Sequence, residues 1–241
     1  FFAGEAPVSL AVLLDVSGSM AVGGNMDRAR EAVHMVAAAL QPPLDEIALF
    51  TFDSKLQQIV PFTTDVRQVS QALLEGRPWG NTSLFDSIEE TAQRVAVRAN
   101  RHRALLVITD GVDTASRLTV SEVSGIAAAI DVPVYLLAVV SPTDHPGGEF
   151  AVVPTQAART ESASLADLSR WTGGEMHTAS RPAHTAQAVQ DLMTELRHQY
   201  VISFEPGARP GWHPIEIRLR KKNMFAHTRG GYIAGPARSG S

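Results

Sequence analysis

The stretch Leu10-Ala11-Val12-Leu13-Leu14-Asp15-Val16-Ser17-Gly18-Ser19 decides the fold of this chain. Its first five residues are apolar without a break, which is typical of a strand covered by helices on both faces of a sheet. A carboxylate and two hydroxyls follow at every second position, at Asp15, Ser17 and Ser19. The stretch therefore predicts a buried parallel strand that ends in a set of oxygen ligands.

Three further apolar runs have the same form, at Ile47–Phe52, Ala104–Ile108 and Val132–Val140. Between them, Met26 to Leu40 and Leu84 to Val95 carry apolar residues at intervals of three and four, which indicates helices that cover the sheet. Strands and helices that alternate along a chain predict an α/β fold. We expect a doubly wound, mostly parallel, Rossmann-like sheet flanked by helices.

Helix boundaries can be read from hydroxyl residues that stand three positions before an acid. Ser83 with Asp86, Thr119 with Glu122 and Ser164 with Asp167 each have this capping-box spacing. The helix that begins near Ser164 should end at Gly173-Gly174, since glycine often follows the last turn. A last helix is expected over Ala186–His198.

After residue 198 the period of the pattern changes to two. Tyr200–Phe204 and Ile215–Leu219 alternate apolar with polar residues, which predicts half-exposed antiparallel strands. The intervening Pro206–Pro214 should be their connecting loop, and Phe225–Ile233 could add a third strand. We therefore divide the chain into a domain at 1–198, a C-terminal β-hairpin extension at 199–234 packed on or beside it, and a disordered end at 235–241.

Composition narrows the classes of function. The chain has 241 residues, 44% hydrophobic and 19% charged, and a net charge of −4, which fits a globular protein and gives no sign of nucleic-acid binding. The one basic cluster, Arg218, Arg220, Lys221 and Lys222, is interpreted as the solvated side of a strand and its turn. The absence of cysteine excludes disulfides and thiolate metal sites.

No apolar run is long enough to insert into a membrane as a span. The residues Phe1-Phe2-Ala3-Gly4 do not make a complete signal peptide. A longer precursor with a signal or anchor remains open.

Two more segments complete the oxygen-ligand set. Asp110 closes the apolar run Ala104–Ile108, and Thr82 stands directly before the expected helix at Leu84. In an open parallel sheet, ligands bind beyond the carboxyl ends of the strands, so these residues should meet Asp15 there. Gly18 would let the chain bend so that both serine hydroxyls face one point. The predicted metal ligands are Asp15, Ser17, Ser19, Thr82 and Asp110.

The alternative for the first three residues is an ordinary capped turn, because Asp, Ser and Gly favour turns for backbone reasons. The nearby Asp113, Thr114 and Ser116 are interpreted as turn formers and not as ligands. The eight histidines show no spacing typical of a metal site.

The charge of the set points to a hard divalent cation. Two carboxylates neutralise such an ion and three hydroxyls add no charge, so the ion would stay electrophilic. Mg²⁺ prefers six oxygens and keeps several waters, which leaves a position for an outside ligand; Mn²⁺ and Ca²⁺ are alternatives. The expected outside ligand is a carboxylate of a protein partner, and the expected role is binding and not catalysis.

The five residues resemble the metal-ion-dependent adhesion site of the von Willebrand factor type A domain, with its pattern Asp-x-Ser-x-Ser, a distant Thr and a distant Asp. The resemblance covers roughly residues 8 to 198. It implies that Ser17, Ser19 and Thr82 supply hydroxyl oxygens, and that Asp15 and Asp110 bind the metal directly or through water.

A second resemblance concerns the end of the chain. Gln199-Tyr200-Val201-Ile202-Ser203-Phe204-Glu205-Pro206 and Thr228-Arg229-Gly230-Gly231-Tyr232 look like the end of bacterial von Willebrand A-related proteins first grouped from acidobacteria. The doubled glycine departs from the usual Arg-x-Gly-Tyr. This likeness implies an extracytoplasmic protein, either periplasmic, secreted or on the cell surface.

Two other functions remain as alternatives. A haloacid dehalogenase-like phosphotransfer enzyme would also place an Asp at the end of the first strand, but such enzymes have a second Asp where this chain has Ser17. The site could also be vestigial or purely structural, with binding by exposed strand edges of the extension. The loop Ser141–Gln156 could add specificity, and the last helix could move on ligand binding.

Overall fold

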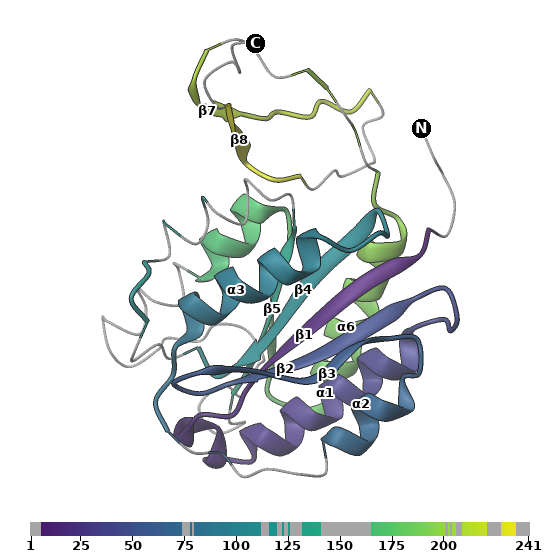
Figure 1. Ribbon diagram of the computed structural model, residues 1–241, viewed down its shortest axis with the longest axis vertical. Helices are drawn as coiled ribbons and strands as arrows, with labels where there is room; N and C mark the ends of the chain where they lie inside the picture. Colours follow the sequence, from purple (N-terminus) through teal and green to yellow (C-terminus); the bar gives the residue numbers. More distant parts are fainter. Residues whose placement is uncertain are drawn as a thin grey trace.

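The apolar runs become neighbouring strands of one central sheet (Figure 1). The computed structural model describes residues 6–73, 78, 80–111, 116–119, 122, 125, 132–140, 165–200, 202, 204–205, 209–220 and 228–234. The sheet has the order β3-β2-β1-β4-β5-β6. The strands are β1 (Val8–Asp15), β2 (Glu46–Phe52), β3 (Leu56–Thr63), β4 (His102–Thr109), β5 (Val134–Val139) and β6 (Met176–Ala179).

Neighbouring strands are parallel except for β3, which runs antiparallel to β2. The predicted α/β class and mostly parallel sheet are therefore confirmed. All four apolar runs are strands. The edge strands β3 and β6 were not predicted, because β3 buries only one of its eight side chains and β6 has only four residues.

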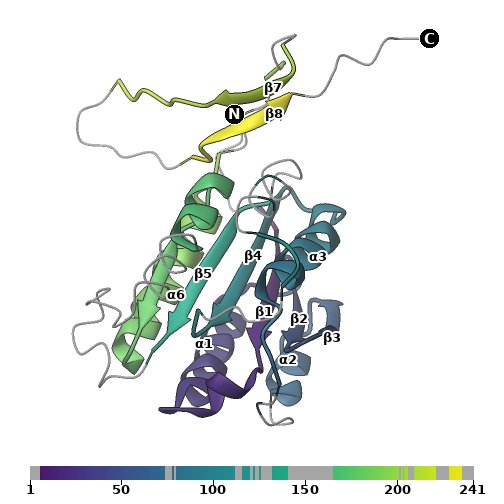
Figure 2. The same ribbon diagram turned by 90° about the vertical axis from the view of Figure 1, so that its left-hand side faces the viewer.

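Helices cover both faces of the sheet, and Figure 2 shows α3 and α6 on opposite sides of it. The helices are η1 (Gly18–Ala21), α1 (Asn25–Ala39), α2 (Arg67–Ala72), α3 (Leu84–Ala96) and α6 (Pro182–Arg197), and residues 165–172 are also helical. One hydrophobic core lies under α1, α2 and α6, and a second lies under α3 and residues 165–172. Strand β1 contributes Leu10 and Val12 to the first core and Ala11 and Leu13 to the second, which is why its sequence is apolar without alternation.

The helix boundaries agree with the sequence in part. Gly173 has a φ of 87°, and the Gly174 amide donates to the Ser169 carbonyl over 2.8 Å, so the predicted glycine stop is confirmed. Thr119 and Glu122 exchange the hydrogen bonds of a capping box. The last helix begins at Pro182, four residues before the predicted Ala186, because proline is favoured in a first turn.

The predicted Ser83–Asp86 capping box is wrong. The Ser83 hydroxyl donates to the Asp53 carbonyl, and the first turn of α3 is capped instead by Ser116, whose hydroxyl oxygen accepts from the Phe85 amide over 2.9 Å. The Asp86 carboxylate accepts from the amides of Arg117 and Leu118. Ser116 therefore caps the amino-terminal end of α3. Ser164, Asp113, Thr114 and the loop Ser141–Gln156 lie outside the described residues.

Gly174 allows the close approach of residues 165–174 to β5. A Cβ atom at Gly174 would overlap the Val134 carbonyl oxygen and lie 3.1 Å from the Tyr135 amide nitrogen. Gly174→Ala should therefore lower the free energy of unfolding by about 1–3 kcal/mol or more in denaturant titrations, because backbone must move. At Gly125 an added Cβ meets nothing within 4 Å, so Gly125→Ala is the matched control. Equal stability of both variants would contradict this packing.

The C-terminal extension, residues 199–234, contains a separate antiparallel pair, β7 (Gly211–Pro214) and β8 (Gly231–Ala234). Its antiparallel character is confirmed, but the strand positions are partly wrong. Strand β7 lies inside the segment predicted to be a loop, and Ile215–Leu219 is not a strand. Proline and glycine at both ends of β7 hid it from propensity rules. The described residues Tyr200, Ile202 and Phe204 are also outside any strand.

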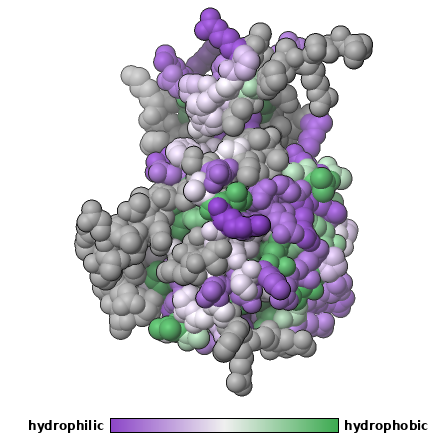
Figure 3. Space-filling model, turned by 60° about the vertical axis from the view of Figure 1, so that its left-hand side comes forward, coloured by the Kyte–Doolittle hydropathy of each residue, from purple (hydrophilic) through white to green (hydrophobic). Residues whose placement is uncertain are grey.

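The extension lies beyond the amino ends of the parallel strands and forms a lobe at the top of Figure 3. Gln199 donates to the Tyr135 hydroxyl over 3.1 Å at the start of β5. The backbone of Arg229 lies close to Gly173, and Gly230 lies close to Trp171. Among the described residues, no helix combines the length and apolar character needed to cross a membrane.

Candidate functional site

The end of β1 places Asp15 at the carboxyl edge of the sheet, with its side chain fully buried. One carboxylate oxygen, Oδ1, accepts the Ser17 amide over 2.8 Å. The other, Oδ2, accepts the Thr109 hydroxyl over 2.6 Å. Both oxygens are therefore oriented by neighbouring loops, one after β1 and the other at the end of β4.

The two serines of the first loop face one another. The chain turns into η1 directly after Ser17, and buried Met20 anchors that turn in the core. The hydroxyl oxygens of Ser17 and Ser19 are 3.1 Å apart. The two hydroxyls thus face one another, although Gly18 between them does not adopt a positive φ. The Gly18 amide donates to the Gly80 carbonyl over 3.0 Å.

The hydrogen bond between the Gly18 amide and the Gly80 carbonyl joins the first loop to the loop that carries Thr82. The same loop is held from β2, because the Asp53 carbonyl accepts both the amide and the hydroxyl of Ser83, over 2.7 and 3.0 Å. Thr82 is 3% exposed. Its position depends on two backbone anchors, Gly80 and Asp53, and neither was identified from the sequence.

Asp110 follows β4 and is partly exposed. Its negative charge raises the pKa of Asp15, which places the two carboxylates within electrostatic range of one another. The pKa of Asp15 rises from 3.8 to about 6, mainly because burial disfavours the ionised carboxylate; hydrogen bonds from Ser17 and Thr109 act in the opposite direction. None of the described basic side chains is a cause of this pKa shift.

The structure thus brings the five predicted residues to one edge of the sheet, on three loops. The Gly18–Gly80 backbone hydrogen bond joins the first two loops, and the Thr109 hydroxyl joins the end of β4 to Asp15. It adds Thr109 as a partner of Asp15, which the sequence analysis missed although Thr109 directly precedes Asp110. No group of three or more His, Cys, Asp or Glu side chains within the described ranges is placed to hold a metal. A cation here would depend on hydroxyl oxygens beside two carboxylates, which suits hard ions.

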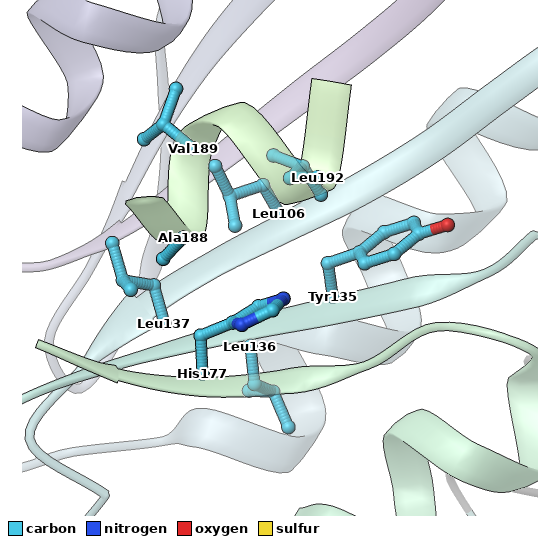
Figure 4. A pocket seen from close by; sticks show the side chains of 8 residues that line it. All are labelled: Leu106, Tyr135, Leu136, Leu137, His177, Ala188, Val189 and Leu192. Atoms are coloured by element: carbon cyan, nitrogen blue, oxygen red, sulfur yellow. The ribbon is translucent and has the colours of Figure 1, made fainter. Parts of the chain in front are cut away.

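A second candidate is the small pocket under α6 shown in Figure 4, lined by apolar side chains and by Tyr135 and His177. The empty volume of this pocket is about 210 Å³, part of which is open to solvent. Small-molecule sites usually start at roughly 300 Å³ and combine apolar walls with converging polar groups. The pocket lies between β4, β5, β6 and the middle of α6, away from Asp15. We interpret it as a packing gap.

Known proteins share this sequence pattern and this fold. Residues 10–112 match the family model of the von Willebrand factor type A domain. No curated protein matches the chain. Many solved structures share the fold.

BatB from Bacteroides thetaiotaomicron is 18% identical, with a TM-score of 0.62 over 78% of this chain and 98% of that one. The von Willebrand factor type A protein from Catenulispora acidiphila is 13% identical, with a TM-score of 0.61 over 80% of this chain and 43% of the other. The pilus adhesin SpaC from Lactobacillus rhamnosus GG is 13% identical, with a TM-score of 0.58 over 79% of this chain and 30% of the adhesin. The chain has the von Willebrand factor type A fold.

Proposed function

We propose that this chain is a metal-dependent protein-binding module. A divalent cation, Mg²⁺ or alternatively Mn²⁺ or Ca²⁺, would be held by Asp15, Ser17, Ser19, Thr82 and Asp110. The observation that carries the proposal is the buried Asp15 carboxylate beside Asp110 and the Ser17–Ser19 hydroxyl pair. A cation would offset the cost of ionising the buried Asp15 carboxylate beside the carboxylate of Asp110.

The neighbouring residues support a fixed ligand geometry. The Ser17 amide and the Thr109 hydroxyl orient Asp15, and the Gly18–Gly80 bond sets the first loop against the Thr82 loop. Such outer contacts orient metal ligands and strengthen binding. The partner would supply a carboxylate to a coordination position that the protein leaves open.

A phosphotransfer role has less support. A nucleophilic Asp15 would need an exposed oxygen, but its side chain is fully buried and both oxygens accept hydrogen bonds. Ser17 also cannot act as the acid and base that a second Asp would provide. We therefore propose binding without catalysis.

An extracytoplasmic location is part of the proposal. The fold is found in a pilus adhesin, a minor pilin from Streptococcus sanguinis and an aerotolerance-related membrane protein from Bacteroides fragilis. The likeness of residues 199–206 and 228–232 to bacterial von Willebrand A-related proteins agrees with export.

The proposal can be tested without a known partner. A random-peptide display library is bound to the immobilised chain in Mg²⁺ and released with EDTA. The enriched peptides should share an acidic residue, and changing that residue to its amide should abolish binding. Peptides that stay bound in EDTA, or that bind equally well to Asp15→Asn, would contradict a metal-bridged carboxylate.

A further inference from the structure

The C-terminal extension exposes most of the large apolar side chains found on the described surface. Six of the eleven are in residues 200–219, and the other five are scattered over separate elements. The six are Tyr200, Ile202, Phe204, Trp212, Ile217 and Leu219. Exposed apolar side chains concentrated in one segment of the chain make that segment a candidate interaction surface.

The described residues of the extension leave these side chains exposed. Its sheet has two strands of four residues each, and an isolated two-stranded sheet is marginally stable in water. Phe204 and His213 pack on the ring of Tyr232, with ring centroids 5.0 and 5.1 Å away. Trp212 remains 50% exposed and Ile202 61% exposed. These side chains are accessible to a second surface.

Charge distinguishes the extension from the rest of the molecule. Residues 199–234 contain six of the 21 Lys and Arg residues but only two of the 25 Asp and Glu residues. The remaining residues therefore have eight more acids than bases. Arg209, Arg218 and Arg220 are exposed, and Arg218 forms an exposed ion pair with Glu216. Figure 3 shows strongly hydrophilic surface at the far end of this lobe.

The extension and the candidate metal site lie at opposite ends of the sheet. Gln199 contacts Tyr135 at the start of β5, whereas Asp15 and Thr109 end β1 and β4. Figures 1 and 2 show the extension above the amino ends of the strands, with η1 at the bottom. A surface that bound the extension would leave the Asp15 edge facing away from it.

We propose that the C-terminal extension docks on an anionic lipid bilayer surface, with Trp212, Ile217 and Leu219 at the headgroup boundary and Arg218 and Arg220 beside lipid phosphates. A bilayer offers apolar contact and negative charge together, and Trp is favoured at that boundary. The acidic remainder would be repelled, which sets the orientation. This differs from the sequence-based interpretation of Arg218 and Arg220 as merely solvated.

A second copy of the chain fits this surface less well. Two extensions would meet with the same net positive charge, which opposes pairing. The acidic remainder of another copy has the right charge, but its described surface exposes large apolar side chains only singly, at Val22, Leu44, Ile59, Val97 and Trp171.

The experiment is vesicle flotation of the purified chain in EDTA, with phosphatidylglycerol–phosphatidylcholine vesicles against pure phosphatidylcholine vesicles. We expect binding to the anionic vesicles to be at least about tenfold tighter and to weaken with salt. Trp212→Ser and Arg220→Glu should each reduce it. The controls Val22→Ser, which also replaces an apolar residue by serine, and Lys55→Glu, which also reverses a charge, change exposed residues near the opposite edge. They should leave vesicle binding unchanged.

Equal binding to both kinds of vesicle, or binding to neither, would overturn the proposal. A concentration-dependent dimer that Trp212→Ser abolishes, without vesicle binding, would assign the surface to a second copy instead. Because the assay contains EDTA, Asp15→Asn should float like the unmodified chain. Failure of the lipid proposal is therefore distinguishable from failure of the metal-binding proposal.

Discussion

Replacing Asp45 by alanine is expected to lower the free energy of unfolding by about 3 kcal/mol, because it removes a buried carboxylate and leaves the mostly buried Arg197 guanidinium without its counter-ion. The Asp45 carboxylate is 1% exposed and accepts from Arg197 over 2.8 Å, from the Val8 amide over 3.0 Å and from the Gln41 amide over 2.8 Å. Arg197 also donates to the Ala39 carbonyl. One carboxylate thus joins the start of β1, the end of α1 and the end of α6.

The measurement is chemical denaturation of Asp45→Ala, compared with Glu90→Ala. Glu90 pairs with Arg94 on the exposed face of α3, so the loss of this pair should cost less than about 1 kcal/mol. A cost for Asp45→Ala as small as that of the control would show that the network does not hold α6 in place.

Asp15→Asn should remove a large pH dependence from the stability of the metal-free protein. The folded-state pKa of Asp15 is about 6, above its ordinary value of 3.8. As pH rises from about 4 to 6, the unfolded chain ionises first, so the folded state loses stability. The shift corresponds to a loss of about 3 kcal/mol that is complete above pH 6.

The asparagine side chain keeps the shape of Asp15 and an oxygen that can accept the Ser17 amide, but it carries no charge to bury. Unfolding of both proteins is measured in EDTA at pH 4 and pH 7. Other titrating groups are common to both proteins, so the difference between their pH dependences reports Asp15. Identical pH dependence would contradict a buried, ionisable Asp15.

The sequence predicted the parts of the fold that depend on local pattern. The unbroken apolar runs favoured strands with two covered faces, and the glycine stop at Gly173 uses a left-handed residue. Strand β3 escaped prediction because Gln57, Gln58 and Ile59 are all exposed, so its alternation is lost. The Asp45–Arg197 pair joins residues far apart in sequence, and no local pattern reports such a contact.

The candidate site was predictable for a similar reason. Asp15, Ser17, Ser19 and Asp110 lie at or just after the ends of predicted strands, and parallel strands bring their carboxyl ends together. Thr82 was placed by the start of the predicted helix at Leu84. The contacts that orient those side chains were not predictable, since Gly80 and Asp53 act through backbone carbonyls. Backbone acceptors are present at every residue, so sequence cannot single them out. The C-terminal extension was the least predictable part, because proline and glycine flank its strands.

The most direct test of the central claim is calorimetric titration of the metal-free chain with magnesium at pH 7. The proposed site predicts saturable binding of one ion per chain, lost in Asp15→Asn and retained in Asp53→Asn. Asp53 has a carboxylate near the same edge, beside Gly80, but is not a proposed ligand. The absence of a saturable heat of binding at millimolar magnesium would contradict the proposed metal site. A titration that is unchanged in Asp15→Asn would contradict it as well.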